Sequence, residues 1–381
     1  MTSREGCFPL SFGSQLPVTA LLAKVPHIVQ EARMNDAPNT HLRYPWEDPP
    51  ENGQAYEVAD GVLWIRLPLP MALDHVNIYA LDEGDSWTIV DTGIHSKRSV
   101  SLWEDVLRGP LQGRPVSRVI LTHHHPDHVG MAGWLMERFG AELIATRTSW
   151  LMARMLILDE EERPTPQAVE FMRAAGMDPQ ILETRANTRP YNFADTCHPI
   201  PVGYTRVKQD DVITAGGRDW DVHIGNGHAP EHLTLWSRSD NLVLAGDQII
   251  SSISPNLGVY PTEPDADPVA DWLEACGRLA ELARPDHLVL SGHKRVFSGL
   301  PIRMRQLIEN HHGALDRLRA HLVEPRTAAD CFPPLFKRKI DGGVYGLALV
   351  ESVAHLNHLL HAGEVSRTKR EDGAWLWQTG G

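Results

Sequence analysis

Cysteine is scarce in this sequence of 381 residues. The four that occur are widely spaced, form no Cys-x-x-Cys pair, and are Cys7, Cys197, Cys276 and Cys331. In a chain of this length that spacing indicates reduced thiols and excludes a disulfide framework. The cysteine pattern therefore favours a cytoplasmic location.

Long apolar runs and excess positive charge are also missing. No stretch approaches the roughly 20 apolar residues that span a membrane. The first 25 residues lack the continuous apolar region of a signal peptide, because Ser, Gly, Gln and Pro interrupt it. The 36 Lys and Arg against 49 Asp and Glu give a net charge of −13, which opposes attraction to nucleic acid or anionic membranes. We expect no membrane partner and disfavour nucleic acid as a partner.

Short β-rich runs alternate with amphipathic segments through the middle of the chain. Residues 96–111 have the apolar spacing of a helix. Strands predicted at 116–122 and 141–147 enclose a predicted helix over 130–140. This alternation predicts an α/β protein in which helices cover a sheet.

Changes of composition divide the chain. We predict an N-terminal extension over 1–54, a central domain over 55–300 and a C-terminal module over 301–381. The central domain contains a helical, Met-rich insertion at 146–182. The C-terminal module has the pattern of three helices and a hairpin turning near 371–373, which predicts a small winged-helix-like fold.

Four histidines and an aspartate occupy six consecutive positions in LTHHHPDHVG, residues 121–130. Alternate side chains of a strand point to one side, so His123 and His125 at the end of the predicted strand project together. Asp127 and His128 follow on the first turn of the next helix. A solvent-facing histidine run is the alternative, but this spacing favours a metal site.

Three further candidates follow apolar strands or glycine turns, namely His228, Asp247 and His293. A preceding Gly lets the backbone approach closely at each of them. We predict one metal held by His123, His125 and His228, and a second held by Asp127, His128 and His293, with Asp247 bridging the two. His124 is expected to point away. Imidazole and carboxylate ligands suit zinc, iron or manganese, and we expect two divalent ions per chain, with zinc preferred.

These motifs together resemble the metallo-β-lactamase-fold hydrolase superfamily. VDTG, THHHPDHVG, GHAPEH, GDQ and SGH occur in the family's order within residues 55–300. The resemblance implies an αββα sandwich, and it implies that Asp91 of VDTG orients a metal ligand. GLALVESVAHLNHLLHAGEV resembles the winged-helix segment that follows this fold in relatives of β-lactamase-like protein 2.

The resemblance implies a metallo-hydrolase that uses a hydroxide bound by two metals. We assign Asp127 the additional catalytic role of orienting that hydroxide. Members that hydrolyse β-lactams often have Cys where Asp247 stands. The Asp points instead to the glyoxalase II, lactonase, phosphodiesterase and ribonuclease branches.

The preferred substrates are small thioesters or esters resembling acyl-glutathione or acyl-CoA. The apolar residues of the insertion would form a lid beside the metals, or pack the insertion's own core; they are Trp150, Met152, Met155, Leu156, Phe171 and Met172. His75 and His232 are candidate pocket residues. Lys294 and Arg295 are candidates to meet a carboxylate or phosphate of the substrate.

Other functions remain open at this point. An endoribonuclease or phosphodiesterase would use the same chemistry, with the basic run at 337–339 as a foothold for RNA. A lactonase is a further alternative. A non-hydrolytic di-iron protein is less favoured, because no flavodoxin-like domain follows the core. Instead of binding RNA, the winged-helix-like module would serve as a contact in a homodimer or as a lid element.

Overall fold

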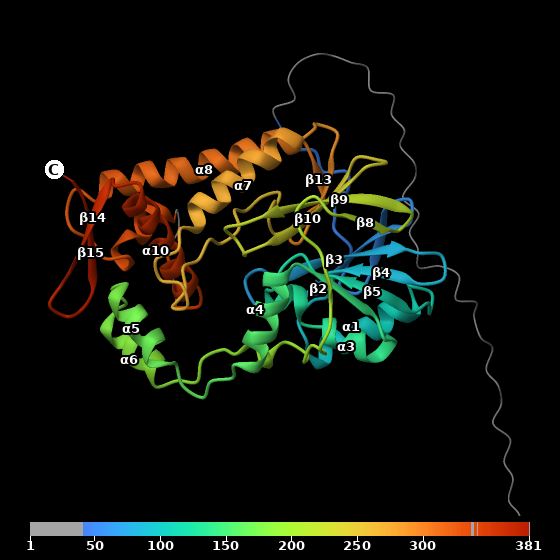
Figure 1. Cartoon of the computed structure of the whole chain (residues 1–381), viewed down its shortest axis with the longest axis horizontal. Coiled ribbons are helices and arrows are strands. Elements are labelled where there is room, and N and C mark those ends of the chain that lie inside the picture. Colours follow the sequence, from blue (N-terminus) through green and yellow to red (C-terminus); the bar gives the residue numbers. More distant parts are fainter. Residues whose placement is uncertain (1–40, 337–338, 341, 381) are drawn as a thin grey trace, which may run out of the picture.

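Two β-sheets form the centre of the molecule, which the computed structural model describes over residues 41–336, 339–340 and 342–380 (Figure 1). The first sheet has seven strands in chain order: β1 Ala55–Ala59, β2 Val62–Pro68, β3 His75–Asp82, β4 Trp87–Val90, β5 Val116–Ile120, β6 Glu142–Ala145 and β7 Thr205–Arg206. Neighbours are antiparallel from β1 to β4 and parallel from β4 to β7.

The second sheet has six strands. Its order is β13 Phe297–Ser298, β12 Leu288–Ser291, β11 Leu242–Gly246, β10 His232–Ser237, β9 Arg218–Gly225 and β8 Val212–Ala215. Apolar side chains from both sheets share one buried cluster, to which Trp64 and Leu81 contribute from the first sheet, and Trp220 and Leu244 from the second. The sheets therefore pack face to face.

Helices cover the outer face of each sheet. A cluster on the first sheet includes residues of α1 Lys97–Arg108 and α3 Ala132–Phe139. The outer face of the second sheet shares a cluster with α7 Pro268–Leu282 and α8 Leu300–His321. The expected αββα sandwich is confirmed. The sequence also explains why α1 begins where it does, because the Ser96 side chain caps it by accepting a hydrogen bond from the Ser99 amide.

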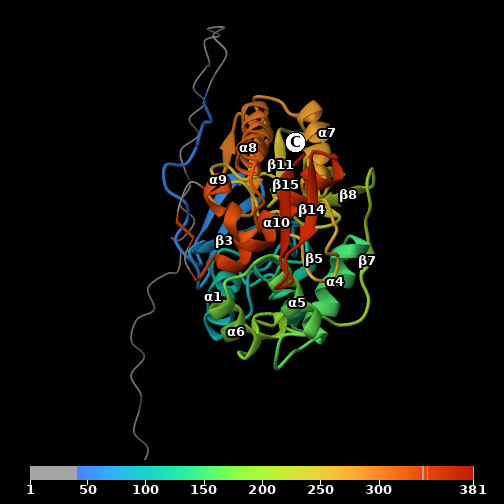
Figure 2. The ribbon, with the colours of Figure 1, turned by 90° about the vertical axis from the view of Figure 1, so that its left-hand side faces the viewer.

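The predicted helical insertion consists of three helices, α4 Arg147–Leu158, α5 Pro166–Ala174 and α6 Pro179–Ala186. They do not form one body: α5 and α6 lie beside the C-terminal elements (Figures 1 and 2), and Figure 1 shows them away from α4. Phe171 belongs to the buried cluster of the C-terminal helices, whereas Trp150 stacks on Tyr204 with ring centroids 4.6 Å apart. The prediction that all six apolar residues form a single lid is wrong.

The physical reason lies between α4 and α5. Residues 159–165 are acidic and contain a proline, so they end α4 and lead the chain away from it. Thr165 then caps α5. The apolar faces of α5 and α6 are covered by a distant part of the chain, which local sequence patterns do not indicate.

The last part of the chain contains α9 Phe332–Leu335 and α10 Tyr345–His361, followed by the hairpin of β14 Val365–Lys369 and β15 Trp375–Thr379. The predicted hairpin with its turn near 371–373 is confirmed. The predicted boundary at residue 300 falls at the first residue of α8. Two residues of the basic run at 337–339 lie outside the described residues. No helix among the described residues is long and apolar enough to cross a membrane.

Candidate metal centre

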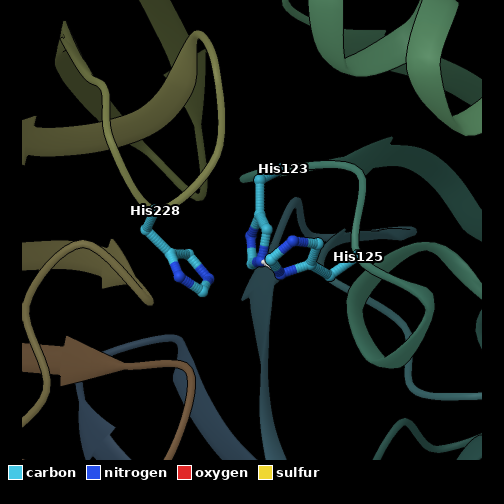
Figure 3. A group of neighbouring side chains, drawn as sticks. All are labelled: His123, His125 and His228. Carbon is cyan, nitrogen blue, oxygen red and sulfur yellow. Dashed lines mark hydrogen bonds between the residues drawn. The ribbon is translucent and has the colours of Figure 1, made fainter. Parts of the chain in front are cut away.

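The first group of candidate ligands lies where β5 gives way to the short helix α2 Pro126–Val129. The strand β5 ends at Ile120, so His123 and His125 lie in the loop after it and not on the longer strand that was predicted. Their imidazoles lie close together, and His228 approaches them from the loop after β9 (Figure 3). The His123 Nε2 and His125 Nδ1 atoms are 3.0 Å apart. One nitrogen from each of the three imidazoles lies within 4.8 Å of the others.

The second group forms beside the first. Asp127 and His128 come from α2, and His293 follows the end of β12. The His293 Nε2 atom is 3.2 Å from Asp127 Oδ2, and the His128 Nε2 atom is 3.7 Å from the same oxygen. Both imidazoles are fully buried. The structure thus brings together the three residues that the sequence predicted for a second metal.

Asp247 lies between the two groups. Its Oδ1 atom is 3.5 Å from His128 Nε2. Its Oδ2 atom is 3.1 Å from His293 Nε2 and 3.5 Å from His228 Nε2. One carboxylate therefore contacts members of both groups, as a bridging ligand must.

Two of these histidines, His128 and His123, form hydrogen bonds to residues outside the two ligand groups. The Asp91 carboxylate accepts from the Thr122 amide at 2.9 Å, from the Thr122 hydroxyl at 2.8 Å, and pairs with His128 Nδ1 at 2.8 Å. The Thr122 hydroxyl also lies 2.9 Å from His123 Nδ1. A hydrogen-bond partner on the ring nitrogen that does not bind the metal fixes the orientation of a metal-binding imidazole. The role that the resemblance implied for Asp91 agrees with these contacts.

Backbone carbonyls hold two further histidines. His228 Nδ1 lies 2.8 Å from the carbonyl oxygen of Asn256, and His293 Nδ1 lies 2.7 Å from that of His75. In each imidazole this leaves Nε2 facing the cluster. The sequence did not indicate Asn256 or Thr122, because a backbone carbonyl has no side-chain signature and a threonine is common at strand ends.

Two candidate pocket residues contact the cluster. His232 Nε2 accepts a hydrogen bond from the Asp247 amide at 3.1 Å, so it fixes the backbone of the bridging residue. His75 contacts His293 through its carbonyl. By contrast, His124 joins neither group and lies parallel to the ring of Phe193 with centroids 6.4 Å apart. Its ring also contacts that of His125, with centroids 4.8 Å apart, so the prediction for His124 holds only in that it belongs to neither ligand group.

Glycine precedes three of the candidate ligands because the chain has no room for a side chain there. A Cβ atom at Gly292 would lie 2.3 Å from Asp247 Oδ1, and one at Gly246 would lie 2.6 Å from His232 Cε1. At Gly227 it would lie 2.2 Å from Trp272 Cβ. The predicted close approach of the backbone is confirmed at all three positions.

Two imidazoles of the first group, those of His123 and His125, are held in the neutral form. Burial, followed by the neighbouring imidazoles of His128 and His125, lowers the pKa of His123 well below its ordinary range. Burial and His228 likewise lower the pKa of His125. Both imidazoles are therefore unprotonated near neutral pH and have a lone pair to offer a metal.

The second group favours positive charge. Burial alone would lower the pKa of His293, but the carboxylates of Asp247 and Asp127 outweigh it and raise that pKa to about 9. The same carboxylates and Asp91 raise the pKa of His128 well above its ordinary value, again against the effect of burial. The carboxylates thus create a buried site that stabilises cations.

The buried polar atoms fit a metal. The Nε2 atoms of His128 and His228 and the Oδ1 atom of Asp247 are buried, and none has a hydrogen-bond partner among the described residues. Leaving such atoms without a partner costs free energy. Metal coordination would satisfy all three, so the donor set fits divalent cations that accept nitrogen and oxygen ligands.

The fold and this donor set define a metallo-hydrolase of the αββα class. Residues 71–293, more than half of the chain, match the family model of the metallo-beta-lactamase superfamily. Residues 315–380 match the model of the metallo-beta-lactamase-like C-terminal domain. The chain belongs to the metallo-beta-lactamase superfamily, and the predicted resemblance is confirmed.

Known proteins resemble the chain over most of its length. The crystal structure of a beta-lactamase domain protein from Burkholderia ambifaria is 36% identical, with a TM-score of 0.82 over 89% of this chain and 98% of that one. A metallo-beta-lactamase family protein from Thermus thermophilus is 24% identical, with a TM-score of 0.71 over 85% of this chain and all of that one, and shows the shared fold. The probable metallo-hydrolase YqjP of Bacillus subtilis (strain 168) is 22% identical over 308 residues, which are 79% of this chain and 92% of YqjP.

Proposed function

We propose that this chain is a cytoplasmic hydrolase of small esters and thioesters that uses two divalent cations, zinc in preference to iron or manganese. His123, His125 and His228 would hold one cation, and Asp127, His128 and His293 the other. The observation that carries the proposal is the position of Asp247, whose two oxygens face His128 and His228 respectively. Divalent cations held in this way lower the pKa of water and polarise the carbonyl oxygen of an ester.

The chain's own groups have distinct tasks in this proposal. Asp127 faces His293 and His128 through Oδ2, so its Oδ1 atom is the one available to accept a hydrogen bond from the attacking water and orient it. Asp91 and the Asn256 carbonyl keep the imidazoles turned toward the cluster. No serine or cysteine nucleophile is required. Cys197, Cys276 and Cys331 are buried, and burial raises the pKa of the Cys276 thiol.

The helix α4 supports an acyl substrate. It begins beside the loop of His228, because the Glu231 carboxylate accepts a hydrogen bond from the Thr148 amide at 2.7 Å. Its residues Leu151, Met155 and Leu158 lie one helical turn apart and are 51%, 46% and 67% exposed. An exposed apolar stripe near a hydrolytic site suits the chain of an acyl group. Of the residues predicted to form the lid, only Met155 belongs to this stripe.

A phosphodiesterase is the second candidate. The exodeoxyribonuclease WalJ of Streptococcus pneumoniae is 28% identical over 74 residues, which are 19% of this chain and 26% of WalJ. The net charge of −13 opposes long polyanions. We therefore place nucleic acids, lactones and non-hydrolytic di-iron chemistry below small esters and thioesters.

The test compares substrates on one preparation. Protein purified without added metal is analysed for zinc, iron and manganese, then assayed against thioesters of increasing acyl length and against single-stranded RNA. We expect chelation to abolish thioester hydrolysis and kcat/KM to rise by up to about fourfold per CH₂, which corresponds to about 0.8 kcal/mol. Met155→Ala should flatten that rise. RNA cleavage that is lost in His123→Ala, with thioesters left intact, would reverse the ranking.

A further inference from the structure

A small cavity lies next to the metal centre. Lys294, the residue that follows His293, is part of its lining. Its volume is about 160 Å³. Its polar lining comes from the N-terminal segment, from β2 and β3, and from the loops after β11 and β12, through Tyr44, Arg66, His75, Ser251, Lys294 and Arg295. A cavity of about 150 Å³ holds a benzene-sized molecule, so this one has room for a charged group and a few further atoms.

The charge of this cavity is opposite to that of the whole chain. Three of its lining residues are cationic, namely Arg66, Lys294 and Arg295. Within the described part of the chain, no carboxylate forms an ion pair with Lys294 or Arg295. Arg66 pairs at 3.3 Å with Asp74, whose side chain is 70% exposed. Asp74 also interacts electrostatically with Lys294, so one exposed carboxylate is set against three cationic side chains.

Its donors are also incompletely used. The Ser251 hydroxyl and the Nε atom of Arg66 are buried and have no hydrogen-bond partner among residues 41–336, 339–340 and 342–380. Ser251 is only 3% exposed. Buried donors without partners are costly, and an anion would accept hydrogen bonds from both.

His75 links this cavity to the metal centre. Its Nε2 atom accepts a hydrogen bond from the Lys294 amide at 2.9 Å, and its Nδ1 atom lies 2.6 Å from Asp74 Oδ1 and 2.9 Å from Arg66 Nη2. Its carbonyl holds His293. Lys294 itself has a left-handed backbone, with φ of 65°, a conformation that is unfavourable for lysine. These contacts fix the position of the Lys294 backbone relative to His293.

Arg295, which also lines the cavity, stacks on the ring of Tyr44. Its guanidinium carbon lies 3.9 Å from the centroid of the Tyr44 ring, and a nitrogen donates to the Glu47 carbonyl at 3.3 Å. Stacking and a single backbone hydrogen bond leave most of the guanidinium donors available. Arginine and lysine together are well suited to carboxylate and phosphate groups.

We propose that this cavity binds an anionic group of the substrate, a carboxylate or a phosphate, and so restricts the enzyme to negatively charged esters and thioesters. This inference rests on the proposed function for the scissile bond, but the anion site itself does not depend on it. The anion would be held by Lys294, Arg66 and Ser251 on one side of His293 while the ester lies over the metal centre.

Two assays on the metal-loaded full chain test the inference. The first measures kcat/KM for succinyl and butyryl thioesters of N-acetylcysteamine, which differ by a carboxylate in place of a methyl group. We expect a preference for the succinyl substrate of about tenfold or more, the size of one charge-assisted contact. That preference should fall in Lys294→Gln and in Lys294→Asn, which tolerates a left-handed backbone. Lys208→Gln removes the same charge from an exposed site outside the cavity and should leave the preference unchanged.

The second assay measures how far succinate or inorganic phosphate raises the unfolding midpoint, since a ligand that binds the folded state stabilises it. The larger shift identifies the preferred anion. Lys294→Gln should reduce the shift and Lys208→Gln should not. A shift that depends on Lys294 in a protein that hydrolyses neither thioester would overturn the proposed function and leave the anion site standing. Equal shifts in both variants would disprove the anion site, and equally efficient hydrolysis of both thioesters by the unaltered chain would disprove its role in selecting the substrate.

Discussion

At the scale of single residues, Asp247 has the contacts on which both ligand groups depend. Its Oδ1 atom approaches His128, and its Oδ2 atom approaches both His293 and His228. Asp247→Asn removes the negative charge and keeps the shape, and an amide offers only one oxygen acceptor. We expect both metals to weaken, so that dialysed protein retains fewer than one metal per chain.

His293→Ala is the comparison for this change, because His293 belongs to one group only. It should remove mainly one of the two metals. Metal content after dialysis, measured on both variants, distinguishes the two effects. Two tightly held metals in Asp247→Asn would refute the bridging role.

Asp91 acts through its neighbours. It is 2% exposed, and three hydrogen bonds join it to Thr122 and His128. It also has a left-handed backbone, with φ of 59°, which Asn tolerates well. Asp91→Asn therefore preserves the backbone while weakening the partner of His128.

We expect Asp91→Asn to reduce metal affinity by about 10- to 100-fold, the usual cost of losing such a partner. Competition with a chromogenic chelator measures the affinity without reference to activity. Asp105→Asn, an exposed change on α1, is the control and should leave the affinity unaltered. An unchanged metal affinity in Asp91→Asn would mean that Asp91 terminates β4 without helping to orient His128.

At the scale of elements, the strand ends position the ligands, and glycine makes this possible. A Cβ atom at Gly292 would meet Asp247 Oδ1 at 2.3 Å and His128 Cε1 at 2.8 Å. Gly292→Ala should therefore displace ligands of the second group and lower metal content and hydrolysis together. The matched change is Gly277→Ala in α7, where a Cβ atom meets nothing within 4 Å.

Thermal unfolding and metal analysis separate these two glycines. Gly277→Ala should stabilise the protein by up to about 1 kcal/mol, because alanine is the better helix former, and should keep both metals. Gly292→Ala should lose metal. If Gly292→Ala retains its metals and activity, the backbone there has more freedom than the structure indicates.

Elements with local signals were predictable from the sequence. The apolar stripe of Trp103, Val106 and Leu107 predicted α1. The His and Asp residues that follow apolar strands predicted the ligand groups. The placement of segments that depends on contacts with distant parts of the sequence was not predictable. The separation of α5 and α6 from α4 results from packing against the C-terminal helices, and the carbonyl that holds His228 belongs to a loop with no recognisable pattern.

At the scale of the whole molecule, the C-terminal module reaches the metal centre through a short path. Asn256 presents its carbonyl to His228, and its side chain donates to the Glu351 carboxylate of α10 at 2.6 Å. The same loop forms a backbone hydrogen bond with α10, from the Val259 amide to the Val350 carbonyl at 3.2 Å. The helix α10 therefore helps to fix the orientation of a metal ligand. This gives the module a structural task in addition to the contact in a homodimer that we propose for it.

Asn256→Ala tests this path, because it releases the loop from Glu351 and leaves the carbonyl that holds His228 in the chain. Without the side-chain hydrogen bonds of Asn256 to α10, that carbonyl should orient the imidazole less well, and we expect metal affinity to fall by about tenfold, at the low end for an outer partner. Asn310→Ala is the matched control: Asn310 of α8 donates to Ser254 of the same loop at 3.0 Å but contacts no ligand. Chelator competition and thermal unfolding, measured on both variants, separate orientation from stability, because both changes remove side-chain hydrogen bonds of the loop, two in Asn256→Ala and one in Asn310→Ala. Equal metal affinities in the two variants would show that the C-terminal module stabilises the loop without positioning His228.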